Sequence, residues 1–167
     1  MQCDPVRSIL SFGVRMRAVI LPVTVLTSTE SIAKEKLDFV FFDATGRLYQ
    51  TSKLAEGLAD QGWNPDEREG AKVLLIETPS LKDPRYTHEM SMLDAPGTIS
   101  EDDKVLYVVS CFDQEFVSGY HTSKQVARVL GHSRARFRVR LLDEHGAVLN
   151  HSAEPISGKT LRKWLRE

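Results

Sequence analysis

The sequence has few of the residues on which redox and metal chemistry depend. Its two cysteines, Cys3 and Cys111, form no Cys-x-x-Cys pair, no zinc-ligand spacing and no disulfide framework. The five histidines include no pair spaced to present two metal ligands from one element. A glycine-rich phosphate loop and the Gly-x-Ser-x-Gly elbow of serine hydrolases are also missing. We therefore expect no metal, no cofactor and a protein that is not an enzyme.

Excess charge of one sign and long apolar runs are scarce too. The formal net charge is -1, which gives no overall attraction to nucleic acid or to anionic membranes. An apolar stretch at residues 18–26 is too short for a bilayer-spanning helix. Apolar residues make up 41% of the 167 positions and charged residues 27%, which suits one packed core. We expect no transmembrane span, and a protein or a small ligand as partner in preference to nucleic acid.

Residues 1–33 have the pattern of a secretory signal. Arg15 and Arg17 precede the apolar stretch, and a polar segment follows that ends in Ser31-Ile32-Ala33. The pattern predicts a signal peptide or N-terminal extension over residues 1–33, a mature chain that begins near Lys34, and a periplasmic or secreted protein. The alternative is a β-strand in a cytoplasmic protein, because the stretch is rich in β-branched residues.

Residues 34–70 predict a small hairpin and a helix, appended to the main domain. The segment Leu37–Gln50 reads as two short strands joined by a turn at Asp43–Gly46. Ser52 is a candidate N-cap for a helix that Gly62 ends. The polar segment that follows, residues 63–71, predicts a loop.

Residues 71–167 alternate strands with helices and then end in a hairpin and a helix. The alternation predicts parallel strands with right-handed crossovers, and the hairpin predicts antiparallel strands at the side of the same sheet. The fold class is therefore α/β, with a mixed central sheet flanked by helices. The predicted elements are, in order, strand 72–77, helix 84–93, strand 104–110, helix 122–131, a hairpin turning at 143–146, and helix 157–167.

Apolar stripes indicate which side of each helix faces the core. In the first crossover helix, Tyr86, Met90 and Leu93 are spaced to share one face. The second crossover helix and the closing helix carry similar stripes. The residues expected to face inward there are Val126, Val129, Leu130, Leu161, Trp164 and Leu165.

Four pieces of this domain carry a resemblance to known proteins. They are the apolar strand Val73–Ile76, the helix start Asp83-Pro84-Arg85, the strand Lys104–Val109 and the hairpin Phe137–Gly146. Their order resembles the thioredoxin fold and, more narrowly, the bacterial domain-of-unknown-function family 4174 (DUF4174). The resemblance implies a thioredoxin-like fold without Cys-x-x-Cys and frequent signal peptides. It implies no activity, since none is established for that family.

The junction between the first strand and its helix is where a thioredoxin-type protein would carry its two thiols. Ser80 and Asp83 stand there instead, and neither can exchange disulfides. Pro84 at the first helical position makes Asp83 the expected N-cap, worth about 1 kcal/mol. The alternative is a binding site at the same helix start, in which Lys82, Arg85 and main-chain N–H groups hold an anion.

Arginines alternate with apolar residues before and within the hairpin. Arg134, Arg136, Arg138 and Arg140 would share one face of a strand. Such a face could bind a polyanion, phosphate or an acidic partner. The alternative is a face whose charges are matched by acidic residues on neighbouring strands.

These patterns favour a redox-inactive, exported binding or accessory module. One alternative is a peroxiredoxin-like thiol enzyme that uses Cys111. We expect Cys111 to be a buried core residue at a strand end, and to lie away from the helix start that activates such thiols. The second alternative is the anion- or polyanion-binding surface on residues 134–140.

Overall fold

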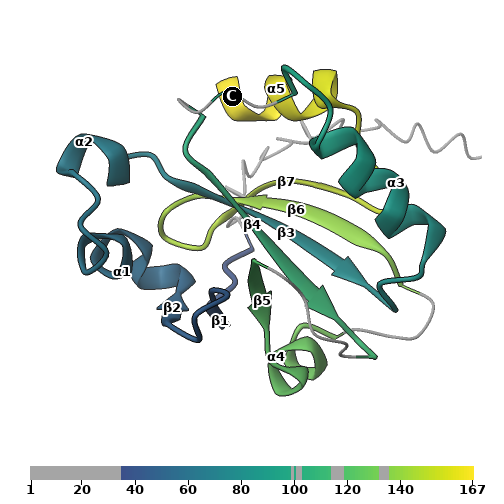
Figure 1. Cartoon of the computed structure of the whole chain (residues 1–167), viewed down its shortest axis with the longest axis horizontal. Coiled ribbons are helices and arrows are strands. Elements are labelled where there is room, and N and C mark those ends of the chain that lie inside the picture. The colour runs from purple at the N-terminus through teal and green to yellow at the C-terminus, as the bar shows by residue number, and fades with distance from the viewer. Residues whose placement is uncertain (1–34, 99, 101–102, 114–118, 132–135) are drawn as a thin grey trace, which may run out of the picture. The chain divides into compact units, whose positions relative to one another are not determined.

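Seven strands form one mixed sheet in the order β2-β1-β5-β4-β3-β6-β7 (Figure 1). The computed structural model describes residues 35–98, 100, 103–113, 119–131 and 136–167. They belong to one compact unit, Ala33–Glu167. The predicted signal segment and Arg134 lie outside the described residues. Within them, no helix has the length and apolar character needed to cross a bilayer.

The centre of the sheet has the predicted arrangement. Strands β3 (Lys72–Thr78) and β4 (Val105–Cys111) pair in parallel, and β6 (Arg138–Leu142) pairs antiparallel with β3. β7 (Val148–Ser152) completes the hairpin with β6. The centre of β3, residues 73–76, is apolar, and its side chains alternate between the two apolar clusters that cover both faces of the sheet. The α/β prediction with a mixed sheet is confirmed.

The N-terminal hairpin extends this same sheet. β1 (Val40–Phe42) pairs with β2 (Leu48–Gln50), as predicted. A third strand that the sequence did not predict, β5 (Tyr120–Thr122), lies between β1 and β4. It is three residues long and has no alternating pattern of its own. Residues 34–70 and 71–167 therefore contribute to one continuous sheet.

The helices depart from the prediction mainly before β3. They are η1 (a 3-10 turn, Thr51–Lys53), α1 (Leu54–Ala59), α2 (Pro65–Arg68), α3 (Pro84–Leu93), α4 (Lys124–Val129) and α5 (Gly158–Arg166). Helix α1 begins after a 3-10 turn and has no side-chain cap, so Ser52 is not its N-cap. The predicted loop contains α2, which begins with a capping box between Asn64 and Glu67.

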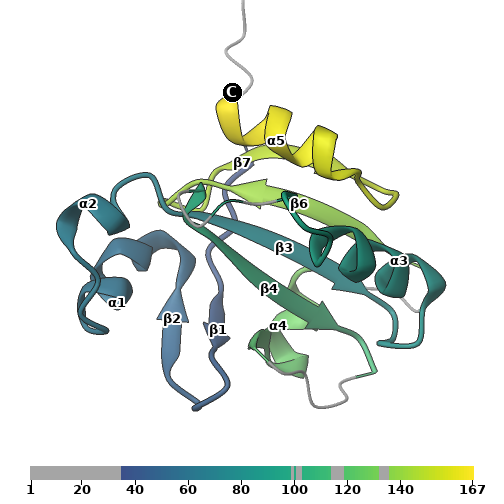
Figure 2. The same cartoon turned by 45° about the horizontal axis from the view of Figure 1, so that its top comes forward.

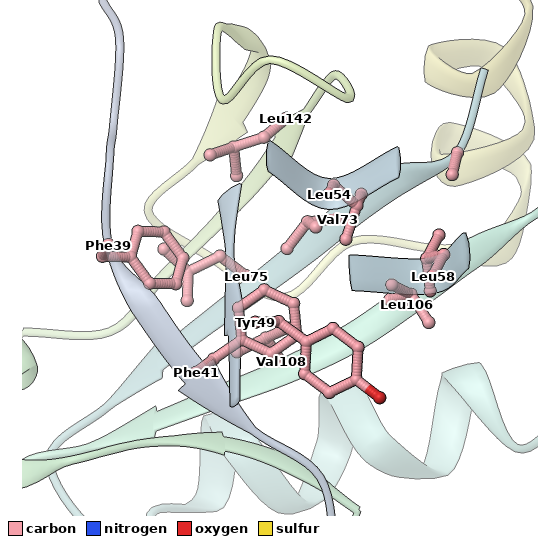
Figure 3. Packing of buried hydrophobic residues seen from close by; sticks show 11 residues of the cluster. Phe39, Phe41, Tyr49, Leu54, Leu58, Val73, Leu75, Leu106, Val108 and Leu142 are labelled. Carbon is pink, nitrogen blue, oxygen red and sulfur yellow. The ribbon is translucent and has the colours of Figure 1, made fainter. Parts of the chain in front are cut away.

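Two apolar clusters lie on opposite faces of the sheet. The first packs α1 and the N-terminal hairpin against one face, with Phe41 and Tyr49 stacked at 5.2 Å (Figure 3). The second packs α3 and α5 against the other face (Figure 2). In the second cluster Leu93 and Leu161 are buried, while the other predicted inward residues of α3 and α5 are partly buried.

One inward residue of α4 was predicted wrongly. Val126 and Leu130 pack against the first cluster, but Val129 is 83% exposed. Ala127 is buried in its place. Positions 126, 127 and 130 form a narrow stripe on the helix, and position 129 falls outside it.

Candidate functional site

The candidate site lies where β3 ends and α3 begins. Asp83 has extended backbone angles (φ -61°, ψ 127°), and its carboxylate accepts a hydrogen bond of 2.8 Å from the main-chain N–H of Arg85. Pro84 occupies the first helical position. The predicted N-cap is confirmed. Proline explains the sharp start, because it disfavours helical geometry at the residue before it.

The Arg85 guanidinium is bound to the same carboxylate. Its Nη2 lies 2.7 Å from one Asp83 oxygen and its Nε lies 3.0 Å from the other. These bonds from Arg85 lower the pKa of Asp83. The guanidinium also lies over the Phe137 ring, 5.5 Å from its centroid. A bound anion would have to compete with Asp83 for both Arg85 and the helix N–H groups, which disfavours the anion-site alternative at this helix start.

An open hollow of about 460 Å³ adjoins this helix start. Ser80, Lys82 and Asp83 line it together with Pro79 and Asp113. The main chain after β4 follows the chain after β3, since Asp113 donates its N–H to the Pro79 carbonyl at 3.1 Å. Sequence reasoning missed Asp113. Parallel strands end at one edge of a sheet, so a polar residue just after β4 was the available signal.

Cys111 is the last residue of β4. It is a free thiol, 5% exposed, and pairs in register with Thr78 at the end of β3. Burial of the Tyr86 hydroxyl, in the first turn of α3, raises its pKa, and the negative charge of an ionised Cys111 would raise it further. The prediction of a buried strand-end residue is confirmed. The register of Cys111 with Thr78 places the thiol at the same edge of the sheet as the helix start.

The arginines of β6 do not form an exposed row. Arg138 and Arg140 both bind the Glu77 carboxylate through paired hydrogen bonds of 2.6 to 3.0 Å. Glu77 is 1% exposed and Arg140 is 2% exposed. For Arg138 and Arg140, the alternative of charges matched by an acidic residue on a neighbouring strand is therefore the correct one. Arg136 is exposed, so a polyanion surface on this segment would lack the two guanidinium groups that Glu77 holds.

A buried acid on α3 escaped the sequence analysis. Glu89 is fully buried, and one of its carboxylate oxygens accepts a hydrogen bond of 2.7 Å from the Ile156 N–H. Burial raises its pKa to about 7. Position 89 lies three residues after Tyr86 and four before Leu93, so it belongs to the predicted apolar stripe. That placement was the available signal.

Metal binding finds no support in the part of the chain that the structure describes. No group of three or more histidine, cysteine or acidic side chains there could hold an ion. The hollow beside α3 offers hydroxyl, ammonium and carboxylate groups, with the Pro79 ring beside them.

Comparisons with known proteins bear on the fold. No protein-family model matches the sequence, and no curated protein matches it either. Among solved structures, peroxidoxin BcpB from Mycobacterium tuberculosis superposes with a TM-score of 0.53 at 18% identity, covering 80% of this chain and 94% of that chain. The fold is thioredoxin-like.

Two further structures share this thioredoxin-like fold. StoA from Bacillus subtilis has a TM-score of 0.52 at 13% identity, covering 78% of this chain and 98% of its own. The exposed lipoprotein thioredoxin of Streptococcus pneumoniae has a TM-score of 0.51 at 17% identity, covering 78% and 98%. At these identities the similarity concerns the fold and leaves the chemistry to the site itself.

Proposed function

We propose that this chain is a thioredoxin-like binding module that recognises a polar ligand or protein segment at the hollow beside α3 and performs no thiol–disulfide exchange there. One observation carries the proposal. Ser80, Lys82, Asp83 and Asp113 line this hollow, at the junction where a thioredoxin-type enzyme would present its thiols. Membership of DUF4174 is part of the same proposal.

The chemistry of exchange supports this assignment. Disulfide exchange requires a thiolate that attacks a sulfur atom, and neither a hydroxyl nor a carboxylate can replace it. Cys111 lies close by, but it is 5% exposed and would have to emerge to meet a second sulfur. Hydrogen bonding by the polar side chains of the hollow requires no such movement.

The binding proposal can be tested by NMR, by following the chemical shifts of the backbone amides as polar fragments and short peptides are added. Ligands are expected to shift the signals of Ser80, Asp83 and Asp113. The variant D113N should weaken the binding of those ligands, whereas D60N, which changes an exposed acid just after α1, should not. Insulin reduction should be absent in the wild type. Insulin reduction that persists in C111S would contradict the proposal. So would ligand binding that D113N and D60N weaken equally.

The alternative is a peroxiredoxin-like enzyme, and the register of β4 supports it by placing Cys111 at the same edge as the hollow. The Cys111 thiolate would attack the peroxide O–O bond, form a sulfenic acid and release water or an alcohol. Two external thiols, or one dithiol, would then reduce the sulfenic acid to the thiol and leave a disulfide and water. Peroxide consumption that C111S abolishes would favour this function over binding.

Export is proposed on the signal-like pattern of residues 1–33, and the pneumococcal structural neighbour is itself an exposed lipoprotein. N-terminal sequencing of the protein from its native host tests it. A mature chain that begins near Lys34 is expected. A chain that retains Arg15 and Arg17 would overturn the proposal and favour the cytoplasmic alternative.

A further inference from the structure

Helix α5 carries a row of basic residues on its outer side. Lys159, Arg162, Lys163 and Arg166 follow the spacing i, i+3, i+4 and i+7, which places them on one side of a helix. Its apolar residues, Leu161 among them, are on the opposite side and pack into the second cluster. Figure 2 shows α5 beside α3, outside one face of the sheet.

Little within the described residues neutralises this basic row. Lys159 and Arg166 are exposed and have no ion pair or side-chain hydrogen bond to another described residue. Lys163 lies 3.5 Å from Glu167, but its side chain is 74% exposed, and such surface pairs are weak. Arg162 donates one bond of 2.6 Å to the Gly97 carbonyl. Most of the positive charge of the row is therefore available to a partner.

A groove of about 400 Å³ runs beside the row. Arg162, Leu165 and Arg166 of α5 line it together with Gly97, Thr98, Ser100 and Asp103. Asp103 accepts a hydrogen bond of 2.7 Å from the Ser100 N–H. A ligand there would meet two guanidinium groups, an aliphatic side chain and one acid.

The shape of this charge selects the kind of partner. The basic row spans about 10 Å of helix, given a rise of 1.5 Å per residue. Asp103 flanks it and Glu167 ends it, so a flat anionic membrane would be brought against these acids as well. A narrow chain can follow the row and avoid them. We propose that the basic row of α5 binds an acidic peptide segment of a partner protein. This surface shares no residue with the hollow beside α3.

Fluorescence anisotropy with a labelled hexaglutamate peptide tests the proposal. Binding by the wild type should weaken as salt is added, because exposed charges are screened. The variant K159E/R166E should bind about tenfold more weakly or worse, since it replaces two attractions by two repulsions. The matched control K124E/R128E makes the same change of charge on the exposed side of α4 and should bind like the wild type.

Further variants and a vesicle control distinguish loss of charge from loss of fold, and this surface from the hollow. The variant K159Q/R166Q should fall between wild type and K159E/R166E, with unchanged thermal unfolding as evidence of an intact fold. D113N should leave peptide binding unchanged, which separates this surface from the hollow. Equal loss in the α4 control would overturn the proposal. So would absence of peptide binding, or binding to phosphatidylglycerol vesicles without binding to the peptide.

Discussion

At the scale of single residues, the polar groups inside the core are the positions of greatest consequence. One Glu89 oxygen and the Tyr107 hydroxyl are buried without a hydrogen-bond partner among the described residues. Burial also raises the pKa of Tyr107 to about 12, with Glu89 among its lesser causes. A buried acid with so few partners is favoured in its neutral form. The side chain is therefore sensitive to pH although it never meets solvent.

We expect the free energy of unfolding to fall as pH rises between about 4.5 and about 7. The folded state holds the Glu89 proton through this range, whereas the unfolded state releases it near the ordinary pKa of the acid. The loss should reach roughly 3 kcal/mol and then level off. Urea unfolding across this range checks it. E89Q should flatten the slope, and an unchanged slope in E89Q would refute the assignment.

Two substitutions can separate the two roles of Asp83, which caps α3 and forms an ion pair with Arg85. Asp83→Ala removes the N-cap of α3 and the Arg85 partner, and should cost about 1 to 2 kcal/mol of unfolding free energy. Asp83→Asn keeps an accepting oxygen at the cap and should cost less. Chemical denaturation of the two variants in parallel gives the comparison. Equal losses would mean that the charge on Arg85, and not the cap, dominates.

At the scale of elements, the junction of β3 with β6 depends on a buried ion network. Glu77 on β3 binds both arginines of β6, and Arg138 also donates to the Leu130 carbonyl after α4. Arg140 reaches Glu35 at 3.1 Å. Arg140 and Glu77 are buried and Arg138 is partly buried, and such charges are tolerable inside a protein while their hydrogen bonds remain complete.

Glu77→Gln should therefore be strongly destabilising. It leaves two guanidinium groups in a covered face of the sheet without their main counter-charge, and breaking a buried pair in this way costs about 3 to 5 kcal/mol. Thermal or urea unfolding measures the loss. D60N is the control, because neutralising an exposed acid changes stability little. A loss no larger than that of D60N would show that water reaches these arginines.

The same elements show what the sequence could and could not predict. Helix α3 and strands β3, β4, β6 and β7 were predictable because capping residues, long apolar runs and a turn glycine mark them. Strand β5 and helix α2 were not, since three- and four-residue elements depend on neighbours distant in sequence. Glu77 could not be recognised as the partner of Arg138 and Arg140 before the register of β3 with β6 was known.

At the scale of the whole molecule, the first described residues are joined to the hairpin near the other end of the chain. Leu37 donates to the Gly146 carbonyl at 2.8 Å, and Val148 donates to the Glu35 carbonyl at the same distance. The Thr51 hydroxyl donates a hydrogen bond of 2.7 Å to the Leu37 carbonyl. The start of the described chain is thereby fixed against the β6–β7 turn.

Gly146→Ala should disrupt this junction. Gly146 has a φ of 80°, and an added Cβ would lie 2.5 Å from the Leu37 carbonyl oxygen. We expect a loss of more than about 1 kcal/mol. Hydrogen exchange should show faster exchange of the Leu37 and Val148 amides. Gly70→Ala, which also has positive φ but meets no atom within 4 Å, is the control for backbone strain alone.

The hydrogen bonds of residues 35–37 also affect how readily a protease can cleave near this end of the fold. A protease must draw its target into an extended cleft, and the Glu35 carbonyl and both main-chain groups of Leu37 are already hydrogen-bonded within the fold. A purification tag joined directly before Glu35 should resist removal, whereas a few intervening flexible residues should restore cleavage.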